Sequence, residues 1–338
     1  MFRVGLTRDF LTADGQLTYQ DMGLDILDKS IGLEYEFLPE HRSPVTPDML
    51  QGYDAIISLT PVYNSESFKG VRGLKAICRF GVGYDMVDLQ ACSEANILVT
   101  ITRGAVNYSV AEATLTWMLA LSHRIFEKDK LVRSGDWSRR SLYMGSELRG
   151  KTLGLIGAGG IGGKLVEMIR VFDMNPPLAF DPYLDKKKAA AAGLQLVELT
   201  TLMKQSDFIS VNCPLTDETR NLIGQNELSL MKKEAFIINT ARGGIIDEGA
   251  LIRVLTERSI AGYATDVFAV EPPSVQDPLF KLDNVIAAPH CIAWTHDLFR
   301  EIGRKVCRQV VQIARGELPE DVVNTDIVKT WRRNQQIV

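Results

Sequence analysis

The chain has 338 residues, more than a single hydrophobic core usually organises, so we expect two domains. Apolar residues make up 46% of the chain and charged residues 24%, as in an ordinary globular protein, which excludes a disordered or fibrous chain. A formal net charge of -4 gives no electrostatic reason to expect nucleic acid or an anionic membrane as a partner.

The cysteine, histidine and hydropathy patterns exclude further classes. Five cysteines without a C-x-x-C pair suit reduced thiols rather than a disulfide framework, and the four histidines show no metal-ligand spacing. No uncharged apolar run approaches the roughly 18 residues of a membrane span, and the N-terminal stretch MFRVGLTRDF lacks the apolar core of a signal peptide. We therefore expect a cytoplasmic protein with no metal site and no membrane contact.

Short apolar runs alternate with helical segments over the first hundred residues, and this alternation predicts a small α/β domain with a parallel sheet. Residues 18–29 and 85–94 have helical character. A last helical stretch, residues 295–315, is long enough to cross back and complete this domain. The apolar runs are residues 2–7, 33–38, 55–59, 74–78 and 97–99.

The longest helical candidate spans residues 107–133 and carries a broad apolar stripe that includes Val110, Trp117 and Leu121. It exceeds the usual length of a globular helix and is long enough for two helices. Two interpretations stay open. The segment either connects two domains or forms a dimer surface, or it is buried within its own domain.

A glycine-rich turn lies in the second α/β region, in the sequence KTLGLIGAGGIGGKLVEMIR. Gly157, Gly159 and Gly162 follow an apolar strand at G-x-G-x-x-G spacing, and a helical stretch comes next. In this pattern the first glycine makes the turn, the second lets the backbone approach a pyrophosphate, and the third lets helix and strand pack closely. The helix N-terminus would hold the phosphates of a dinucleotide, although glycine turns also occur for packing alone.

An acidic residue follows at the position where a dinucleotide fold needs one. The next apolar run ends at Asp181, close to the spacing of about 20 residues that places a carboxylate on the ribose. A carboxylate there accepts hydrogen bonds from the ribose hydroxyls and repels a 2'-phosphate. The pattern therefore favours NAD over NADP.

Each later apolar run delivers polar residues at its carboxyl end, the edge where an open parallel sheet binds its ligands. We therefore expect these residues to line one crevice with the glycine loop. They are Asn212, Cys213 and Pro214, then Asn239, Thr240, Ala241 and Arg242, then Asp266, and finally Pro289 and His290.

Three side chains could carry a hydride-transfer reaction in that crevice. His290 suits the general acid/base that exchanges the hydroxyl proton. The guanidinium of Arg242 can bind a carboxylate through two hydrogen bonds, and Glu271, before two prolines, can orient the histidine ring. Taken singly, each has a plainer explanation: a structural histidine, an arginine in an ion pair and an exposed loop glutamate.

Several motifs in order make the chain resemble the D-isomer-specific 2-hydroxyacid dehydrogenases. The blocks are RFGVGYDMVD, VAEATL, LRGKTLGLIGAGGIG, NCPLTDETR, NTARGGIIDEGAL, ATDVFAVEPP and NVIAAPH. The resemblance implies an NAD-binding Rossmann domain, residues 102–295, inserted into a smaller flavodoxin-like α/β substrate-binding domain made of residues 1–101 and 296–338. It also implies a homodimer.

The resemblance implies roles for individual residues as well. Arg242 would bind the substrate carboxylate, Glu271 would support the histidine, and His290 would be the acid/base. Backbone N–H groups of Val82 and Gly83 would also contact the carboxylate. Trp294 would lie near the mouth of the site, and Asp266 would hold the nicotinamide carboxamide. The expected cofactor-binding residues are Gly157, Gly159, Gly160, Ile161, Gly162, Asp181, Cys213, Pro214, Thr219, Thr240, Ala241, Arg242, Asp266 and His290.

Departures from the family pattern concern the substrate rather than the reaction. Met86, Ala113 and Asn212 stand where the family commonly has other residues, and PHCIAW replaces the common PHIAG, which introduces Cys291 and Trp294. The expected reaction is the interconversion of a small D-2-hydroxy acid and its 2-keto acid with NAD(H).

Two alternatives to this function stay open. One is a reaction on phosphite or on a phosphorylated hydroxy acid, with Arg8 and Arg79, both just after predicted strands, as additional anion-binding residues. The other is a non-catalytic NAD(H) sensor of the corepressor type. Retention of the catalytic trio argues against the sensor, because a sensor needs no acid/base.

Overall fold

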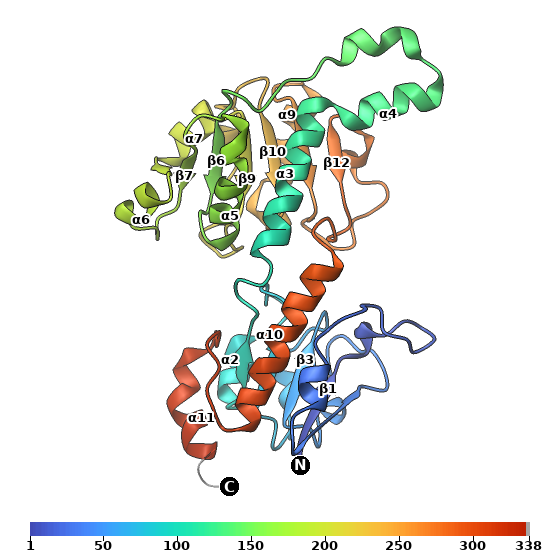
Figure 1. Ribbon diagram of the computed structural model, residues 1–338, viewed down its shortest axis with the longest axis vertical. Helices are drawn as coiled ribbons and strands as arrows, with labels where there is room; N and C mark the ends of the chain where they lie inside the picture. Colours follow the sequence, from blue (N-terminus) through green and yellow to red (C-terminus); the bar gives the residue numbers. More distant parts are fainter. Residues whose placement is uncertain (336–338) are drawn as a thin grey trace. The chain divides into compact units, whose positions relative to one another are not determined.

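The chain divides into two compact α/β units (Figure 1). The computed structural model describes residues 1–335. Unit 1 comprises Met1–Val106 and the chain from Trp294 onward, and unit 2 comprises Asn107–Ala293. Every pair of neighbouring strands within the two sheets runs parallel, as the alternation of strands and helices predicts. The predicted fold class is thereby confirmed.

The sheet of unit 1 has five strands in the order β2-β1-β3-β4-β5. This order is the flavodoxin-like one, in which the strand sequence reverses beside the first strand and opens a crevice at the carboxyl ends. The predicted apolar runs form these strands, with ends that differ by one or two residues. The strands are β1 (Phe2–Leu6), β2 (Leu33–Phe37), β3 (Ala55–Ser58), β4 (Ala76–Arg79) and β5 (Leu98–Thr100).

The helix predicted over residues 18–29 is wrong, because only α1 (Asp25–Asp28) forms there. Gly23 has a φ of +71°, and a Cβ on it would lie 2.8 Å from the backbone nitrogen of Arg304. The chain therefore leaves helical geometry to pack against α10 (His296–Ala314), which crosses to β4 as the sequence predicts. The other helices of unit 1 are α2 (Leu89–Glu94) and α11 (Val328–Gln335).

The sheet of unit 2 has seven strands in the order β12-β11-β10-β9-β6-β7-β8. Six of them reproduce the dinucleotide-binding order, which reverses between the first and fourth strands, here β6 and β9. The strands are β6 (Leu153–Ile156), β7 (Leu178–Phe180), β8 (Gln195–Leu196), β9 (Phe208–Val211), β10 (Phe236–Asn239), β11 (Gly262–Thr265) and β12 (Val285–Ala287).

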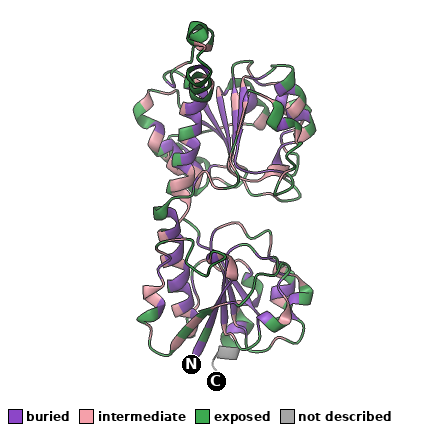
Figure 2. Cartoon of the chain, turned by 90° about the vertical axis from the view of Figure 1, so that its right-hand side faces the viewer, coloured by how far each residue is buried: buried purple, intermediate pink, exposed green. Residues whose placement is uncertain are grey.

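Helices cover both faces of this sheet, so its strands are buried on both sides (Figure 2). On one face α3 and α5 pack through a core that includes Trp117 and Leu165. On the other face α7, α8 and α9 pack through a core that includes Leu202 and Leu251. The helices of unit 2 are α3 (Asn107–His123), α4 (Ile125–Ser134), α5 (Gly160–Ile169), α6 (Lys186–Ala191), α7 (Leu199–Gln205), α8 (Gln225–Leu228) and α9 (Glu248–Thr256).

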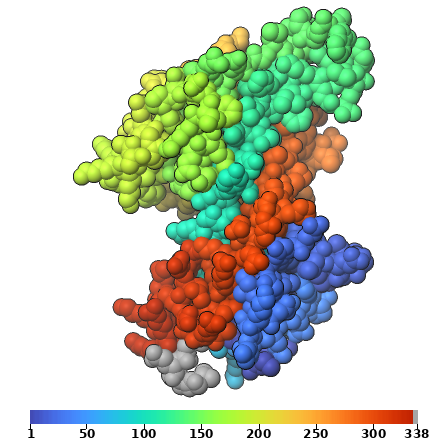
Figure 3. All heavy atoms as spheres, in the orientation of Figure 1, coloured from blue at the N-terminus to red at the C-terminus, as the bar shows by residue number. Residues whose placement is uncertain are grey.

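The long helical segment over residues 107–133 is two helices, and the two have different surroundings. Arg124 separates them with a left-handed φ of +52°. Helix α3 is buried in its own unit, whereas Leu131 is the one buried residue of α4. Together with the 3-10 segment Trp137–Tyr143, α4 forms an arm that projects from unit 2 (Figure 1) and appears as a separate lobe in Figure 3.

Candidate active site

The parallel strands of unit 2 bring the predicted residues to one edge of its sheet. Each of these residues comes shortly after the carboxyl end of its strand, and neighbouring strands therefore place neighbouring residues. Along the edge, from β7 to β12, the residues are Asp181, Gly157, Cys213, Thr240, Asp266 and His290.

The glycine loop makes the turn from β6 into α5 as the motif predicts. Gly157 has a φ of +87°, and a Cβ on it would lie 2.8 Å from the backbone nitrogen of Cys213. A Cβ on Gly162 would lie 3.0 Å from the carbonyl oxygen of Gly157, so this glycine permits close packing of helix and strand. A Cβ on Gly159 would meet no atom of the described chain within 4 Å, so a ligand can approach its backbone.

Helix α5 begins at Gly160, and Gly159 is its N-cap residue. Ile161 and Gly162 complete the first turn, whose backbone N–H groups point out of the helix and suit an anion. A Cβ on Gly160 would overlap the side-chain amide of Asn107, so this glycine lets the start of α3 lie against the loop.

Asp181 is held against the glycine loop. Its Oδ2 accepts a hydrogen bond from the backbone N–H of Ala158 at 3.0 Å, and its Oδ1 accepts one from the backbone N–H of Tyr183 at 3.0 Å. These two bonds fix the carboxylate beside the phosphate-binding turn. Its predicted contact with the ribose stays a prediction.

His290 and Glu271 form the central contact of the edge. The Nδ1 of His290 lies 2.7 Å from Oε2 of Glu271, with the N–H donating when Nδ1 carries the proton. The other carboxylate oxygen, Oε1, accepts from the backbone N–H of Phe268 at 3.0 Å. The carboxylate therefore selects the tautomer that leaves Nε2 for substrate chemistry.

The backbone of His290 is itself unusual. Its φ is +54°, in the left-handed region that residues other than glycine rarely adopt. Such conformations cost roughly 1–3 kcal/mol and persist where the surrounding structure enforces them. The loop after β12 is thus shaped to present this ring, and 49% of the side chain is exposed.

The electrostatics of Glu271 favour a charged carboxylate. Partial burial by itself would raise its pKa, but the hydrogen bonds from His290 and Phe268 and the positive charges of His290 and Arg242 outweigh burial, so the pKa lies below its usual value. Glu271 is therefore ionised at neutral pH and can stabilise a protonated imidazole.

Arg242 lies close enough to influence Glu271, and a glycine explains why. A Cβ on Gly243 would overlap the backbone of Phe268, so the loop of Arg242 packs directly against the loop that leads to Glu271. The guanidinium also donates to the carbonyl oxygen of Ala241 at 2.7 Å.

Asp266 holds the loop that carries His290. Its Oδ1 accepts from the backbone N–H groups of Cys291 at 2.8 Å and Ile292 at 3.1 Å. Burial raises the pKa of Asp266 to about 6, although these two hydrogen bonds and the charge of His290 act in the opposite direction. Its predicted bond to a nicotinamide carboxamide stays a prediction.

The remaining predicted residues close the loops after β9 and β10. The hydroxyl of Thr219 donates to the carbonyl oxygen of Pro214 at 2.7 Å, and Cys213 is half-buried, which raises the pKa of its thiol to about 11. The hydroxyls of Thr240 and Thr114 lie 3.4 Å apart. These contacts order the backbone of both loops.

Asn239 belongs to the polar residues that the sequence places at the strand ends, but the sequence assigns it no role of its own. The structure shows it fully buried at the end of β10, where its Oδ1 accepts from Ala241 N at 3.0 Å and its Nδ2 donates to Arg242 O at 2.8 Å. An asparagine that ends an apolar strand just before a reactive residue is the signal for this positioning role.

The other substrate-binding candidates belong to unit 1. Val82 and Gly83 follow β4, and Trp294 precedes α10. Arg79 donates to the carbonyl oxygen of Phe80, and Arg8 donates to Thr12 O at 3.3 Å. These bonds direct both arginines toward their own backbone. A role in anion binding stays a prediction.

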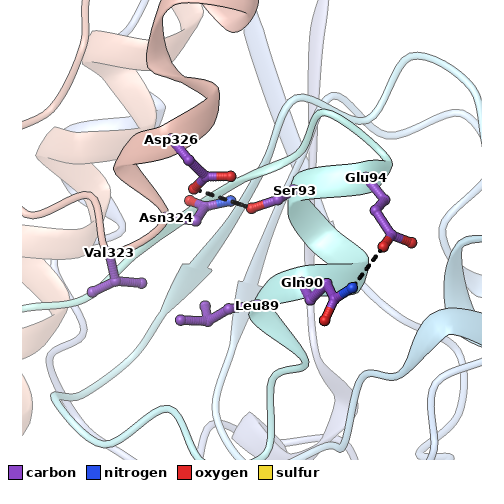
Figure 4. Close-up of a pocket in the computed structure, with 7 residues that line it drawn as sticks. All are labelled: Leu89, Gln90, Ser93, Glu94, Val323, Asn324 and Asp326. Atoms are coloured by element: carbon purple, nitrogen blue, oxygen red, sulfur yellow. Dashed lines mark hydrogen bonds between the residues drawn. The ribbon is translucent and has the colours of Figure 1, made fainter.

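A shallow groove in unit 1 lies between α2 and the segment before α11 (Figure 4). Asn324 and Asp326 meet Ser93 there, and Gln90 bonds Glu94 at 2.9 Å. None of the predicted site residues lines it, and the residues that do line it include no histidine. We therefore place the candidate site at the strand ends of unit 2.

Among residues 1–335, no cluster of histidine, cysteine, aspartate and glutamate side chains has the arrangement of a metal site. Within the same part of the chain, the helices are all too short or too polar to span a membrane.

Comparison with known proteins places this architecture in a family. Residues 115–291 match the family described as D-isomer specific 2-hydroxyacid dehydrogenase, NAD binding domain. A D-3-phosphoglycerate dehydrogenase of Methanocaldococcus jannaschii is 44% identical over 252 residues, which are 74% of this chain and 48% of that protein. A glyoxylate reductase of Thermococcus litoralis is 36% identical over 306 residues, covering 87% of this chain and 92% of that protein.

A solved structure agrees with these matches. The glyoxylate reductase from Paecilomyes thermophila superposes with a TM-score of 0.81 at 27% identity and covers 96% of this chain and 99% of that one. The chain spans about half the length of the phosphoglycerate dehydrogenases it matches and most of the length of the glyoxylate reductases. The chain belongs to the D-isomer specific 2-hydroxyacid dehydrogenase family.

Proposed function

We propose that this chain is an NAD(H)-dependent oxidoreductase that interconverts a D-2-hydroxy acid and the corresponding 2-keto acid. The observation that carries the proposal is the 2.7 Å contact between His290 and Glu271, next to Arg242 on the same sheet edge. This arrangement combines an oriented acid/base with a cation that suits a carboxylate.

The residues of the glycine loop fit the cofactor that this proposal needs. The open space at Gly159 and the N-terminus of α5 suit a pyrophosphate, and the fixed carboxylate of Asp181 suits a ribose diol. A bound nicotinamide supplies the hydride for reduction and accepts it in oxidation. Asp181 would disfavour a 2'-phosphate, so we propose NAD(H) rather than NADP(H).

The protein's own groups handle charge and protons. Arg242 binds and orients the substrate carboxylate. In the reducing direction the protonated Nε2 of His290 donates its proton to the carbonyl oxygen, and in oxidation the neutral ring removes it. Glu271 stabilises the positive ring, and Asp266 and Asn239 keep the two reactive loops in place.

A panel of 2-keto acids tests the proposal. Purified protein with NADH should oxidise the cofactor, followed at 340 nm, when given at least one of glyoxylate, hydroxypyruvate, pyruvate, a branched-chain keto acid or a phosphorylated one. Tight NADH binding without turnover of any acid would contradict an enzymatic function and favour a sensor. A strong preference for NADPH would contradict the assigned cofactor.

A phosphorylated acid is the second candidate substrate. The match to D-3-phosphoglycerate dehydrogenases favours it, and Arg8 and Arg79, near the strand ends of unit 1, are the residues that would hold its phosphate. The same panel separates the two, because a substrate held by additional cations should lose affinity steeply as salt increases. Arg8→Ala should then raise KM for the phosphorylated acid alone.

We further propose a homodimer that uses the α4 arm. The arm exposes Phe126, Val132, Trp137 and Leu142, whose side chains contribute little to the core of unit 2. A second copy of the chain could cover this apolar surface. Sedimentation analysis should give twice the monomer mass, and Val132→Asp should shift it toward the monomer.

A cytoplasmic location completes the proposal. All five cysteines are free thiols, which suits a reducing compartment. Cell fractionation should recover the protein with the cytoplasmic enzymes, and recovery from an oxidising compartment would contradict this.

A further inference from the structure

Three buried polar side chains lie at the base of the two loops of unit 2 that carry Arg242 and Glu271. They are Asn239 at the end of β10 and Tyr263 and Thr265 on β11, of which 0%, 3% and 0% is exposed. We call them the buried network. Polar groups in a core lower stability unless hydrogen bonds satisfy them, so such a group of three is informative about what they hold together.

The sheet itself brings these side chains together. Asn239 and Thr265 are direct partners in the parallel register of β10 and β11, and neighbouring strands lie only about 4.8 Å apart. Tyr263 is two residues before Thr265 on the same strand, so both side chains point to the same face. Tyr263 packs in the core that includes Leu251 and Leu255 of α9. The whole arrangement therefore lies within unit 2.

One end of the network holds the loop of Arg242. The side chain of Asn239 accepts from Ala241 N at 3.0 Å through Oδ1 and donates to Arg242 O at 2.8 Å through Nδ2. An amide nitrogen carries two hydrogens, so Nδ2 has a second hydrogen for another acceptor. Asn239 can therefore fix this loop and still bond a further side chain.

The other end holds the loop that leads to Glu271. The hydroxyl of Thr265 donates to Val267 O at 2.7 Å and accepts from Val267 N at 3.2 Å. The next residue, Phe268, donates its backbone N–H to Oε1 of Glu271 at 3.0 Å. Thr265 therefore fixes the turn that presents the partner of the histidine.

The phenol of Tyr263 connects the two ends. Burial raises the pKa of Tyr263 to about 12, although hydrogen bonds with the side chains of Thr265 and Asn239 act in the opposite direction. The phenol is uncharged at physiological pH, and it bonds both the residue that fixes the Arg242 loop and the residue that fixes the Glu271 loop.

We infer that Tyr263 is a positioning residue that holds the Arg242 loop and the Glu271 loop at a fixed spacing. The inference rests on the proposed function and names a residue that acts through the reacting groups without touching the substrate. Arg242 has to bind the carboxylate of the same small acid whose carbonyl oxygen meets the pair of Glu271 and His290. A small error in the spacing of these groups is costly for the reaction.

The network complements a contact already seen between the two loops. Gly243 packs against the backbone of Phe268, which fixes the loops to each other beyond the strand ends. The network fixes them where they leave β10 and β11. Loss of the phenol hydroxyl would leave Asn239 and Thr265 without a shared partner and free the base of both loops to shift.

The test uses substitutions that remove one hydroxyl and keep the shape of the side chain. Tyr263→Phe and Thr265→Val are made singly and together, and Thr265→Ser restores the hydroxyl at the second position. Tyr53→Phe is the matched control, because its phenol donates to Glu36 at 2.9 Å in unit 1, outside the network. For each full-length protein we measure Tm, the Kd of NADH by fluorescence titration, and kcat and KM for the keto acid that the wild type accepts best.

We expect Tyr263→Phe to lower kcat/KM about 10-fold or more well below its Tm, through a higher KM and a lower kcat together, because both loops shift. The Kd of NADH should stay the same, since the glycine loop follows β6 and lies outside the network. Thr265→Val should act in the same way and Thr265→Ser should restore most of the activity. The double variant should lose little more than the single ones, because the two hydroxyls act as one unit. Tyr53→Phe should match the wild type.

A lower Tm in Tyr263→Phe with unchanged kcat and KM would overturn the inference and leave the proposed function standing, because the network would then serve stability alone. Losses that multiply in the double variant would overturn it too, since independent hydroxyls cannot form one connection. If Tyr263→Phe does not fold, the comparison of Thr265→Val with Thr265→Ser decides: equal activity in these two variants would overturn the inference. Turnover of no acid by the wild type would overturn the proposed function and the inference with it.

Discussion

The two units end their parallel strands in similar edges but equip them differently. Unit 2 presents charged groups in hydrogen bonds, with His290 on Glu271 and Arg242 nearby. Unit 1 presents stacked rings, with Tyr19 on Phe299. Charged groups can move protons and bind a carboxylate, whereas rings can only sort side chains by size and polarity. On the proposed function, unit 2 therefore holds the groups that carry the reaction.

The largest effect should follow from removing the acid/base of unit 2. His290→Ala should lower kcat about 10²- to 10⁴-fold for every accepted keto acid, because no other group is placed to exchange the proton. Steady-state kinetics at saturating NADH measures this, and His41→Ala, an exposed histidine of unit 1, serves as the control. Turnover close to wild type in His290→Ala would show that His290 is not the acid/base of unit 2.

A smaller loss should follow from neutralising the partner of the histidine. Glu271→Gln keeps the shape of the side chain but loses a charge-assisted hydrogen bond, so kcat should fall roughly 10- to 100-fold. Steady-state kinetics at saturating NADH and keto acid measures the fall in kcat. A kcat close to wild type would show that Glu271 is only structural.

The next effect concerns the cofactor. Asp181→Ala removes a carboxylate that is fixed by Ala158 N, so the kcat/KM ratio of NADPH to NADH should rise about tenfold. An unchanged ratio would show that other residues determine cofactor choice. Keto-acid preference should stay as in the wild type, because Asp181 is held against the glycine loop and not beside His290.

The smallest effect concerns stability and pH. The pKa of Asp266 is raised from its usual value to about 6, so the folded chain binds this proton more tightly than the unfolded chain does. The resulting stabilisation is complete below about pH 4 and is lost as pH rises through about 6. Asp266→Asn keeps an acceptor for Cys291 N and Ile292 N and avoids the buried charge.

The Tm difference between Asp266→Asn and the wild type should therefore shift in favour of the variant as pH is raised from 4.5 to 8. A shift of two pKa units corresponds to about 3 kcal/mol at most, or a few degrees in Tm. Differential scanning fluorimetry at both pH values measures the difference, and a Tm difference that does not change with pH would contradict the prediction.

Much of unit 2 could be predicted from sequence because its function depends on local rules. Parallel strands place their final residues together whatever the loops do, and this predicts the row from Asp181 to His290. The turn at Gly157 needs a positive φ, which the glycine motif signals directly. The pairing of Glu271 with His290 spans 19 residues of sequence. The residue types suggest it, because a carboxylate can orient a histidine ring, and the family resemblance implies it as well.

Unit 1 was less predictable because its main features are tertiary. The helical pattern over residues 18–29 is overruled by the close approach of Gly23 to Arg304, a contact between segments far apart in the chain. The stacking of Tyr19 on Phe299 has the same tertiary origin. Tyr19 and Phe299 are ordinary residues in the sequence, and their stacking depends on the fit of Gly303 against Met22.

The central claim, that the His290–Glu271 pair of unit 2 carries the acid/base chemistry, is tested most directly by one measurement, the ratio of kcat/KM for phenylpyruvate to that for glyoxylate in Glu271→Gln. The account predicts that Glu271→Gln slows both acids equally and keeps the ratio, because both acids need the same proton. A loss of activity confined to one of the two acids would contradict it.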